Sequence, residues 1–165
     1  MSIPKKNCPV PFDQQPLNEY LSLKKSSLFL WSTYDTKDYS IVLLLLFLIL
    51  FVFCGCFLFL FFINEINLYK IFIFDLLIVN IILFFICIRL YLGWSYIVKR
   101  LLSATVFYEE SGWYDGQVWV KTVDSLMQDR LIGLYQIMPY IIRIRYTCLI
   151  VCLSCLLYLF LYKLF

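Results

Sequence analysis

The stretch IVLLLLFLILFVFCGCFLFLFFI fills residues 41–63 and contains no charged side chain. At 1.5 Å per residue, these 23 residues can cross a hydrocarbon core of about 30 Å as one helix. Residues 71–92 form a second apolar run, which carries Asp75 and Asn80, and residues 146–164 form a third. The sequence therefore predicts a mainly α-helical membrane protein with three transmembrane helices.

The remaining residues divide into an N-terminal segment at 1–40, a short link at 64–70 and a polar module at 93–145. Residues 16–31 fit either a short interfacial helix or an irregular tail, and the sequence leaves both open. Residues 95–103 are expected to continue the second helix beyond the membrane.

Strand-forming side chains at 105–121 flank a Ser-Gly-Trp-Tyr-Asp-Gly turn, which predicts a β-hairpin. Apolar residues at three- and four-residue spacing over 123–138 predict an amphipathic helix. Pro139 is expected to bend the chain into the third span.

Basic residues are unevenly divided between the two sides of this arrangement. Of 14 Lys and Arg residues, only Lys70 and Lys163 lie on the side of the short link, which leaves 12 on the other side. The positive-inside rule then places the N-terminus and the 93–145 module in the cytoplasm or its plastid equivalent, the stroma. A net charge of +3 without a basic tail gives no indication of nucleic-acid binding.

The chain contains no histidine, which excludes Ser-His-Asp chemistry and imidazole ligation by its own residues. It has seven cysteines, of which six lie within the expected spans, where small polarizable packing residues are favoured over a metal site. Cys8 is a lone thiol outside them. We therefore expect no cofactor, no metal and no enzymatic activity.

Six residues around the hairpin turn are candidates for function: the carboxylate cluster Glu109, Glu110 and Asp115, and the aromatic residues Trp113, Tyr114 and Trp119. Three acids close together could bind a hard cation or act as an acid/base pair. A solvated turn is the favoured interpretation, with partner contact through the aromatic residues as a further possibility.

Two polar residues lie inside the second predicted span. Asp75 is near one end of it, so a structural ion pair with Lys70 or Lys163 is favoured over a proton or ion relay. Asn80 is expected to form a hydrogen bond between helices.

The chain resembles the hypothetical chloroplast reading-frame family number thirty-six over essentially its whole length. Three blocks carry the resemblance, namely Cys8-Pro9-Val10-Pro11 through Gln14 with Pro16-Leu17-Asn18-Glu19-Tyr20, then Ser95 to Arg100 with Leu101, and finally Tyr108 to Gln117 with Trp119, Lys121, Asp129-Arg130 and Pro139. Asp13 stands where the family usually has glutamate, and Thr122 stands where proline is common. The resemblance implies a plastid membrane protein of a photosynthetic lineage, loosely linked to chloroplast function and iron-limited acclimation, and it supplies no catalytic residues.

Together these features predict a non-enzymatic accessory, assembly or stabilising factor for a photosynthetic membrane complex. Its expected surroundings are the lipid bilayer and other thylakoid or envelope membrane proteins. One alternative is a membrane enzyme or iron-handling protein that uses Cys8 and the carboxylate cluster. A second alternative is a small transporter that depends on Asp75, which would require an oligomer.

Overall fold

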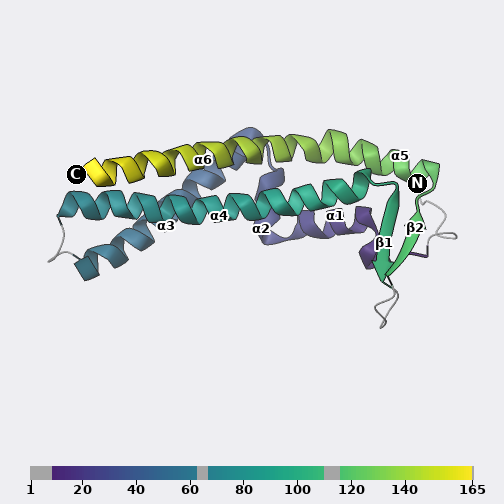
Figure 1. Ribbon diagram of the computed structural model, residues 1–165, viewed down its shortest axis with the longest axis horizontal. Helices are drawn as coiled ribbons and strands as arrows, with labels where there is room; N and C mark the ends of the chain where they lie inside the picture. The colour runs from purple at the N-terminus through teal and green to yellow at the C-terminus, as the bar shows by residue number, and fades with distance from the viewer. Residues whose placement is uncertain (1–8, 63–66, 110–115, 165) are drawn as a thin grey trace.

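A computed structural model describes residues 9–62, 67–109 and 116–164, and three long helices dominate it (Figure 1). The described elements, in chain order, are a 3-10 turn η2 (Phe12–Gln14), α1 (Pro16–Lys25), α2 (Ser27–Leu30), a 3-10 turn η3 (Trp31–Thr33), α3 (Thr36–Phe62), α4 (Leu68–Leu102), β1 (Thr105–Glu109), β2 (Gly116–Val120), α5 (Val123–Ile132), a π-helical turn η4 (Gly133–Ile137) and α6 (Met138–Leu164). The predicted mainly helical fold is confirmed.

Three helices are long and apolar enough to cross a membrane: Thr36–Phe62, Leu68–Leu102 and the continuous helix Val123–Leu164. They contain 27, 35 and 42 residues, and so extend about 40, 52 and 63 Å. Each exceeds the roughly 30 Å of a hydrocarbon core. The predicted spans fall on these helices, which continue beyond them into the polar end of the molecule.

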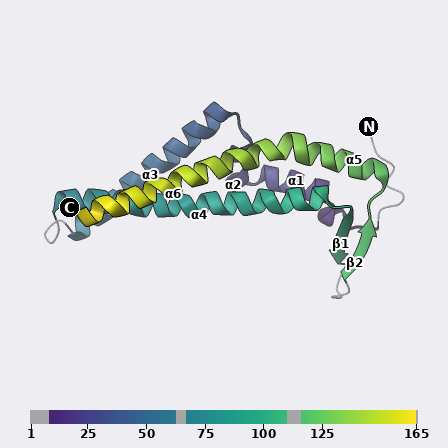
Figure 2. The ribbon, with the colours of Figure 1, turned by 45° about the horizontal axis from the view of Figure 1, so that its top comes forward.

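Helix α4 is the centre of the fold. It packs against α6 along its length and against α3 over a shorter stretch, and it carries more buried residues than either. Helix α3 crosses the other two at an angle (Figure 2) and buries only Tyr39 and Leu58 among its residues. Most of its apolar side chains are therefore exposed to the surroundings of the protein.

Pro139 does not interrupt the last helix, which runs without a break from Val123 to Leu164. Five residues directly before Met138 form a wide π-helical turn. Because proline has no N–H to donate within a helix, a wide turn at this point accommodates it. Figure 2 shows the helix curving between α5 and α6, so the expected bend takes place within a continuous helix.

The N-terminal segment is helical and packs on the polar-end half of α4. Tyr20 of α1 and Phe29 of α2 surround the fully buried Trp94, with ring centroids 6.1 and 5.8 Å away. Gly93 makes room for this packing, because a Cβ atom there would overlap the Phe29 ring. Of the two alternatives for residues 16–31, the helical one is therefore correct.

The predicted hairpin is also confirmed as a two-stranded antiparallel sheet in which Thr105 pairs with Val120 and Glu109 with Gly116. Figures 1 and 2 both show it projecting sideways from the end of α4. Its inner face packs Val106, Tyr108 and Trp119 against the buried Val10. The N-terminal segment thus supports both the helix and the hairpin.

Candidate functional site

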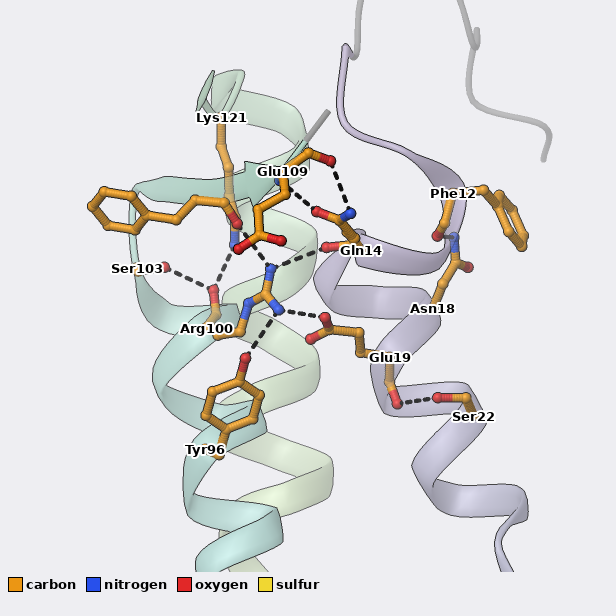
Figure 3. Close-up of polar contacts among 11 residues, drawn as sticks. Phe12, Gln14, Asn18, Glu19, Ser22, Tyr96, Arg100, Ser103, Glu109 and Lys121 are labelled. Carbon is orange, nitrogen blue, oxygen red and sulfur yellow. Dashed lines mark hydrogen bonds and ion pairs between the residues drawn. The ribbon is translucent and has the colours of Figure 1, made fainter. Parts of the chain in front are cut away.

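Arg100, in the last turn of α4, joins three separate parts of the chain. Its guanidinium forms an ion pair with Glu19 of α1 and donates hydrogen bonds to the backbone carbonyls of Gln14, at 3.1 Å, and Phe107, at 3.3 Å. It also donates to the Tyr96 hydroxyl at 3.1 Å. The planar fork of arginine, with five N–H donors, makes such multiple recognition possible. Figure 3 shows the guanidinium between α1, α4 and β1.

Gln14 binds the backbone of β1 through its side-chain amide. Its Nε2 donates to the Glu109 carbonyl at 3.0 Å, and its Oε1 accepts from the Glu109 N–H at 2.9 Å. The amide thereby forms the same pair of hydrogen bonds with Glu109 that the backbone of a neighbouring β-strand would form. Asn18 steadies the same segment by donating to the Phe12 carbonyl at 2.8 Å.

Lys121, directly after β2, caps the C-terminal end of α4. Its ammonium group donates to the carbonyls of Arg100 and Leu101, both at 3.0 Å, and pairs with Asp129 of α5 at 2.6 Å. The Lys121 side chain is only 1% exposed. A cation at a helix C-terminus also interacts favourably with the helix dipole. This contact fixes β2 and α5 onto the end of α4.

We call the five residues Gln14, Glu19, Arg100, Lys121 and Asp129 the polar junction. Their strong donors mostly bind acceptors of this same protein, which leaves little capacity for a substrate. Burial raises the pKa of Glu19 above its usual value, while Arg100 beside it acts in the opposite direction. The described residues contain no group of three His, Cys, Asp or Glu side chains that could hold a metal ion. The contacts of the junction hold the hairpin against α1, α4 and α5.

The sequence-predicted residues at the hairpin turn are only partly described. Glu110, Trp113, Tyr114 and Asp115 lie outside the described residues. Glu109 is exposed, and its backbone is bound by Gln14. Trp119 is half-buried on the inner face of the hairpin, so its packing contacts are with the N-terminal segment.

Exposed apolar residues occupy the opposite face of the hairpin. Phe107 and Val118 are paired across the two strands, and Val120 lies on the same face. Phe107 is 71% exposed, and both valines are more than half exposed. Val123 and Met127 of α5 are also exposed. We call Phe107, Val118 and Val120 the outer hairpin face.

Within the apolar helices, the predicted ion pair of Asp75 is wrong. Among the described residues, the ion pairs are those of Arg100 with Glu19 and of Lys121 with Asp129. Asp75 instead faces α3, where a Cβ atom on Gly55 would lie 2.9 Å from its Oδ2. Its Oδ1 is buried and has no hydrogen-bond partner in the described part of the chain.

Asn80 forms the interhelical contact predicted for it. The Ser154 hydroxyl of α6 donates to Asn80 Oδ1 at 2.8 Å. The six cysteines of the described segments are all free, and Cys87 is buried. Of the other five cysteines, Cys56 and Cys152 are exposed and the remaining three are partly buried.

Sequence reasoning missed the polar junction as a unit. Each of its residues lies in one of the blocks that carried the family resemblance, but the contacts of Gln14 and Glu19 join positions 81 to 95 residues apart. The available signal was a charged or amide residue in each block.

The fold and the junction define a class of protein: three long apolar helices whose polar end carries a β-hairpin fixed by charged side chains. The family model described as CGLD27-like, conserved in the green lineage and diatoms 27, matches residues 8–150. The chain therefore belongs to the CGLD27-like family.

Three relatives illustrate the extent of the similarity. The protein named uncharacterized protein ycf36 from Porphyra purpurea is 47% identical over 157 residues, covering 94% of this chain and 92% of its own length. Its namesake from Cyanophora paradoxa is 48% identical over 140 residues, covering 85% and 88%. The chloroplastic protein conserved in the green lineage and diatoms 27 from Arabidopsis thaliana is 40% identical over 154 residues, covering 87% of this chain and 44% of its own length. No solved structure matches the chain. The family resemblance found in the sequence is thus confirmed.

Proposed function

We propose that this chain is a multi-pass plastid membrane protein that acts as a non-enzymatic accessory, assembly or stabilising factor for a photosynthetic membrane complex. The chloroplastic name of the Arabidopsis relative supports the plastid location. Three helices of sufficient length and apolarity support membrane insertion. The partners are then other proteins of the thylakoid or envelope membrane.

The orientation follows from charge. Twelve of the 14 Lys and Arg residues belong to the N-terminal segment, the 93–145 module and the adjoining helix end, and two lie at the opposite side. The positive-inside rule assigns the richer side to the stroma. The hairpin and the polar junction are therefore stromal.

The outer hairpin face is the observation that carries this proposal. Three neighbouring apolar side chains are exposed on a hairpin whose orientation is fixed by Gln14, Arg100 and Lys121. A rigid, exposed apolar patch on a stromal module is suited to binding another protein. Because the polar groups of the junction bind one another, the outer hairpin face is the surface that binds the partner protein.

The proposal is tested by native gel electrophoresis of the tagged chain after gentle solubilisation of plastid membranes. We expect migration with a photosystem or one of its subassemblies. Phe107→Ser should weaken that association by at least about tenfold, which corresponds to about 1.4 kcal/mol. Phe12→Ser is the matched control, because Phe12 is 64% exposed, close to the 71% of Phe107, and lies outside the hairpin.

Migration of the wild-type chain alone, at the mass of a monomer or small oligomer, would contradict the proposal. Equal weakening by the two serine variants would contradict the role of the outer hairpin face. Loss of function in Glu109→Gln with normal accumulation and normal complex formation would instead favour a carboxylate-based activity.

A further inference from the structure

The backbone groups on the two edges of the hairpin can be assigned from its register. In an antiparallel pair, alternate residues direct their N–H and C=O groups toward the partner strand. The Lys121 N–H donates to the Ala104 carbonyl at 3.0 Å, and Thr105 is aligned with Val120. The residues that direct their backbone groups outward are therefore Thr105, Phe107 and Glu109 on β1, and Gly116, Val118 and Val120 on β2.

The outward edge of β1 is closed by side chains of this chain, and Figure 3 shows the contacts between Gln14 and Glu109. Three side chains provide the contacts: Ser103 donates to the Thr105 carbonyl at 2.9 Å, Arg100 donates to the Phe107 carbonyl at 3.3 Å, and Gln14 pairs with both backbone groups of Glu109. No further strand can pair along this edge without displacing the polar junction.

The outward edge of β2 is open. The outward N–H and C=O groups of Val118 and Val120 have no hydrogen-bond partner among the described residues. Figures 1 and 2 both place β2 on the side of the hairpin away from α1 and α4. The same two valines belong to the exposed outer hairpin face. Unpaired backbone groups and exposed apolar side chains therefore coincide on one strand.

We propose that this edge binds an extended segment of a partner protein, which adds to the hairpin as a third strand beside β2. The segment pairs with the backbone of Val118 and Val120 and packs alternate apolar side chains against the outer hairpin face. This inference rests on the proposed function, because it specifies how the partner complex is held.

The chemistry of the edge selects an extended peptide. Backbone donors and acceptors repeated every second residue match another strand, whereas a helix satisfies its own backbone groups and a lipid tail has none to offer. A two-stranded hairpin is also only marginally stable by itself, and a third strand stabilises it.

Charge and position define the occupant further. Strand β2 carries no charged residue, while exposed acids lie near its two ends, Glu109 opposite Gly116 and Asp124 in the first turn of α5. A partner segment with apolar residues at its centre and Lys or Arg at its ends is complementary to this arrangement. Helix α4 is about 52 Å long, roughly 20 Å more than a hydrocarbon core needs, so the hairpin at its stromal end lies clear of the lipid tails.

The edge can be blocked without disturbing the pairing of β1 with β2. The Val118 N–H points outward, so Val118→Pro removes a donor that β1 does not use. Val118→Thr is the matched control, because threonine keeps both the N–H and the β-branched shape.

The test introduces a photoreactive benzoyl-phenylalanine at Val120 of the full chain in native plastid membranes and sequences the cross-linked peptide. We expect an apolar segment of a different protein flanked by basic residues. Adding Val118→Pro should lower the cross-link yield by about fivefold, as expected for the loss of the one backbone hydrogen bond that the Val118 N–H donates to the added strand. Adding Val118→Thr should leave the yield nearly unchanged.

The result that overturns strand addition is a cross-link yield unaffected by Val118→Pro, or cross-links confined to lipid or to a second copy of this chain. Absence of any cross-link overturns it as well. If the proline variant does not form the hairpin, strand addition is tested by hydrogen exchange in the wild-type complex. The proposal requires that the backbone amides of Val118 and Val120 exchange more slowly when the partner is bound. A wild-type chain that migrates alone on the native gel contradicts the proposed function itself, whereas a complex that forms without these effects contradicts only the strand pairing.

Discussion

At the scale of single residues, the Glu19 carboxylate forms an ion pair but is also partly removed from water, which is unfavourable for its charged form. One carboxylate oxygen contacts Arg100, while Oε2 is buried and has no hydrogen-bond partner within the described residues. Burial raises the pKa of Glu19 above the usual 4.5, and the opposing effect of Arg100 is smaller. The folded chain therefore binds this proton more readily than the unfolded chain does. The stability contributed by protonation is complete below 4.5 and is lost as the pH rises through the folded-state pKa.

The variant Glu19→Gln removes the charge and keeps an oxygen that can accept from Arg100. We expect its melting temperature in detergent to equal or exceed that of the wild type at neutral pH. As the pH drops toward about 4, protonation of Glu19 stabilises the wild type, so the melting temperature of the variant should become the lower of the two. The readout is the difference between the two melting temperatures across a pH series. Glu109→Gln, which changes an exposed glutamate, should follow the wild type throughout. A difference that does not vary with pH would show that Glu19 protonation is not linked to folding.

At the scale of elements, the sequence predicted the helices and the hairpin but not which face of the hairpin is buried. Long apolar runs and a glycine-containing turn are local signals, and they identified α3, α4, α6 and the two strands. Trp119 was expected at a partner-binding surface, yet it packs inward because Val10, more than 100 residues earlier in the chain, covers that face. Strand alternation then places Val118 and Val120 outside. Which face is buried was decided by a contact that no local pattern contains.

Lys121 illustrates the same limit and provides a test of how α4, β2 and α5 are joined. The sequence counted it only among the 12 basic residues of one side of the membrane, and gave no sign that its side chain is buried and pairs with Asp129. Lys121→Met should lower the free energy of unfolding by about 3 kcal/mol, because it leaves a largely buried carboxylate unpaired. Lys121→Met combined with Asp129→Leu should recover part of this loss, since of the two helix-end carbonyls only that of Leu101 then lacks a side-chain donor, while that of Arg100 still accepts from Ser103.

The comparison is made by chemical unfolding of the wild type, both single variants and the double variant. If the effects of the two single variants simply add, the coupling energy is near zero. The ion pair between Lys121 and Asp129 would then contribute nothing to the stability of the contact between β2, α5 and α4. Arg130→Met is a control for the loss of a basic side chain beside Asp129 on α5, because Arg130 is exposed.

At the scale of the whole molecule, α4 connects the two functional ends. One half packs against α3 and α6 through Val79, Leu83 and Val151. The other half supports the N-terminal segment and the hairpin around Trp94. One continuous helix therefore connects the hairpin with the packed apolar helices, as the proposed role of joining a stromal partner to the membrane requires.

This arrangement makes a prediction about topology. In the proposed topology, three membrane crossings put the two ends of the chain on opposite sides, and the positive-inside rule predicts a stromal N-terminal end. Trypsin added to sealed plastid membrane vesicles with the stromal face outward should remove an N-terminal epitope tag and leave a C-terminal tag intact. Detergent should expose both tags. Loss of both tags without detergent would contradict three crossings, whereas selective loss of the C-terminal tag would keep three crossings and reverse the orientation. In that reversed case the hairpin could not meet a stromal partner, and the proposed function would fail together with the orientation.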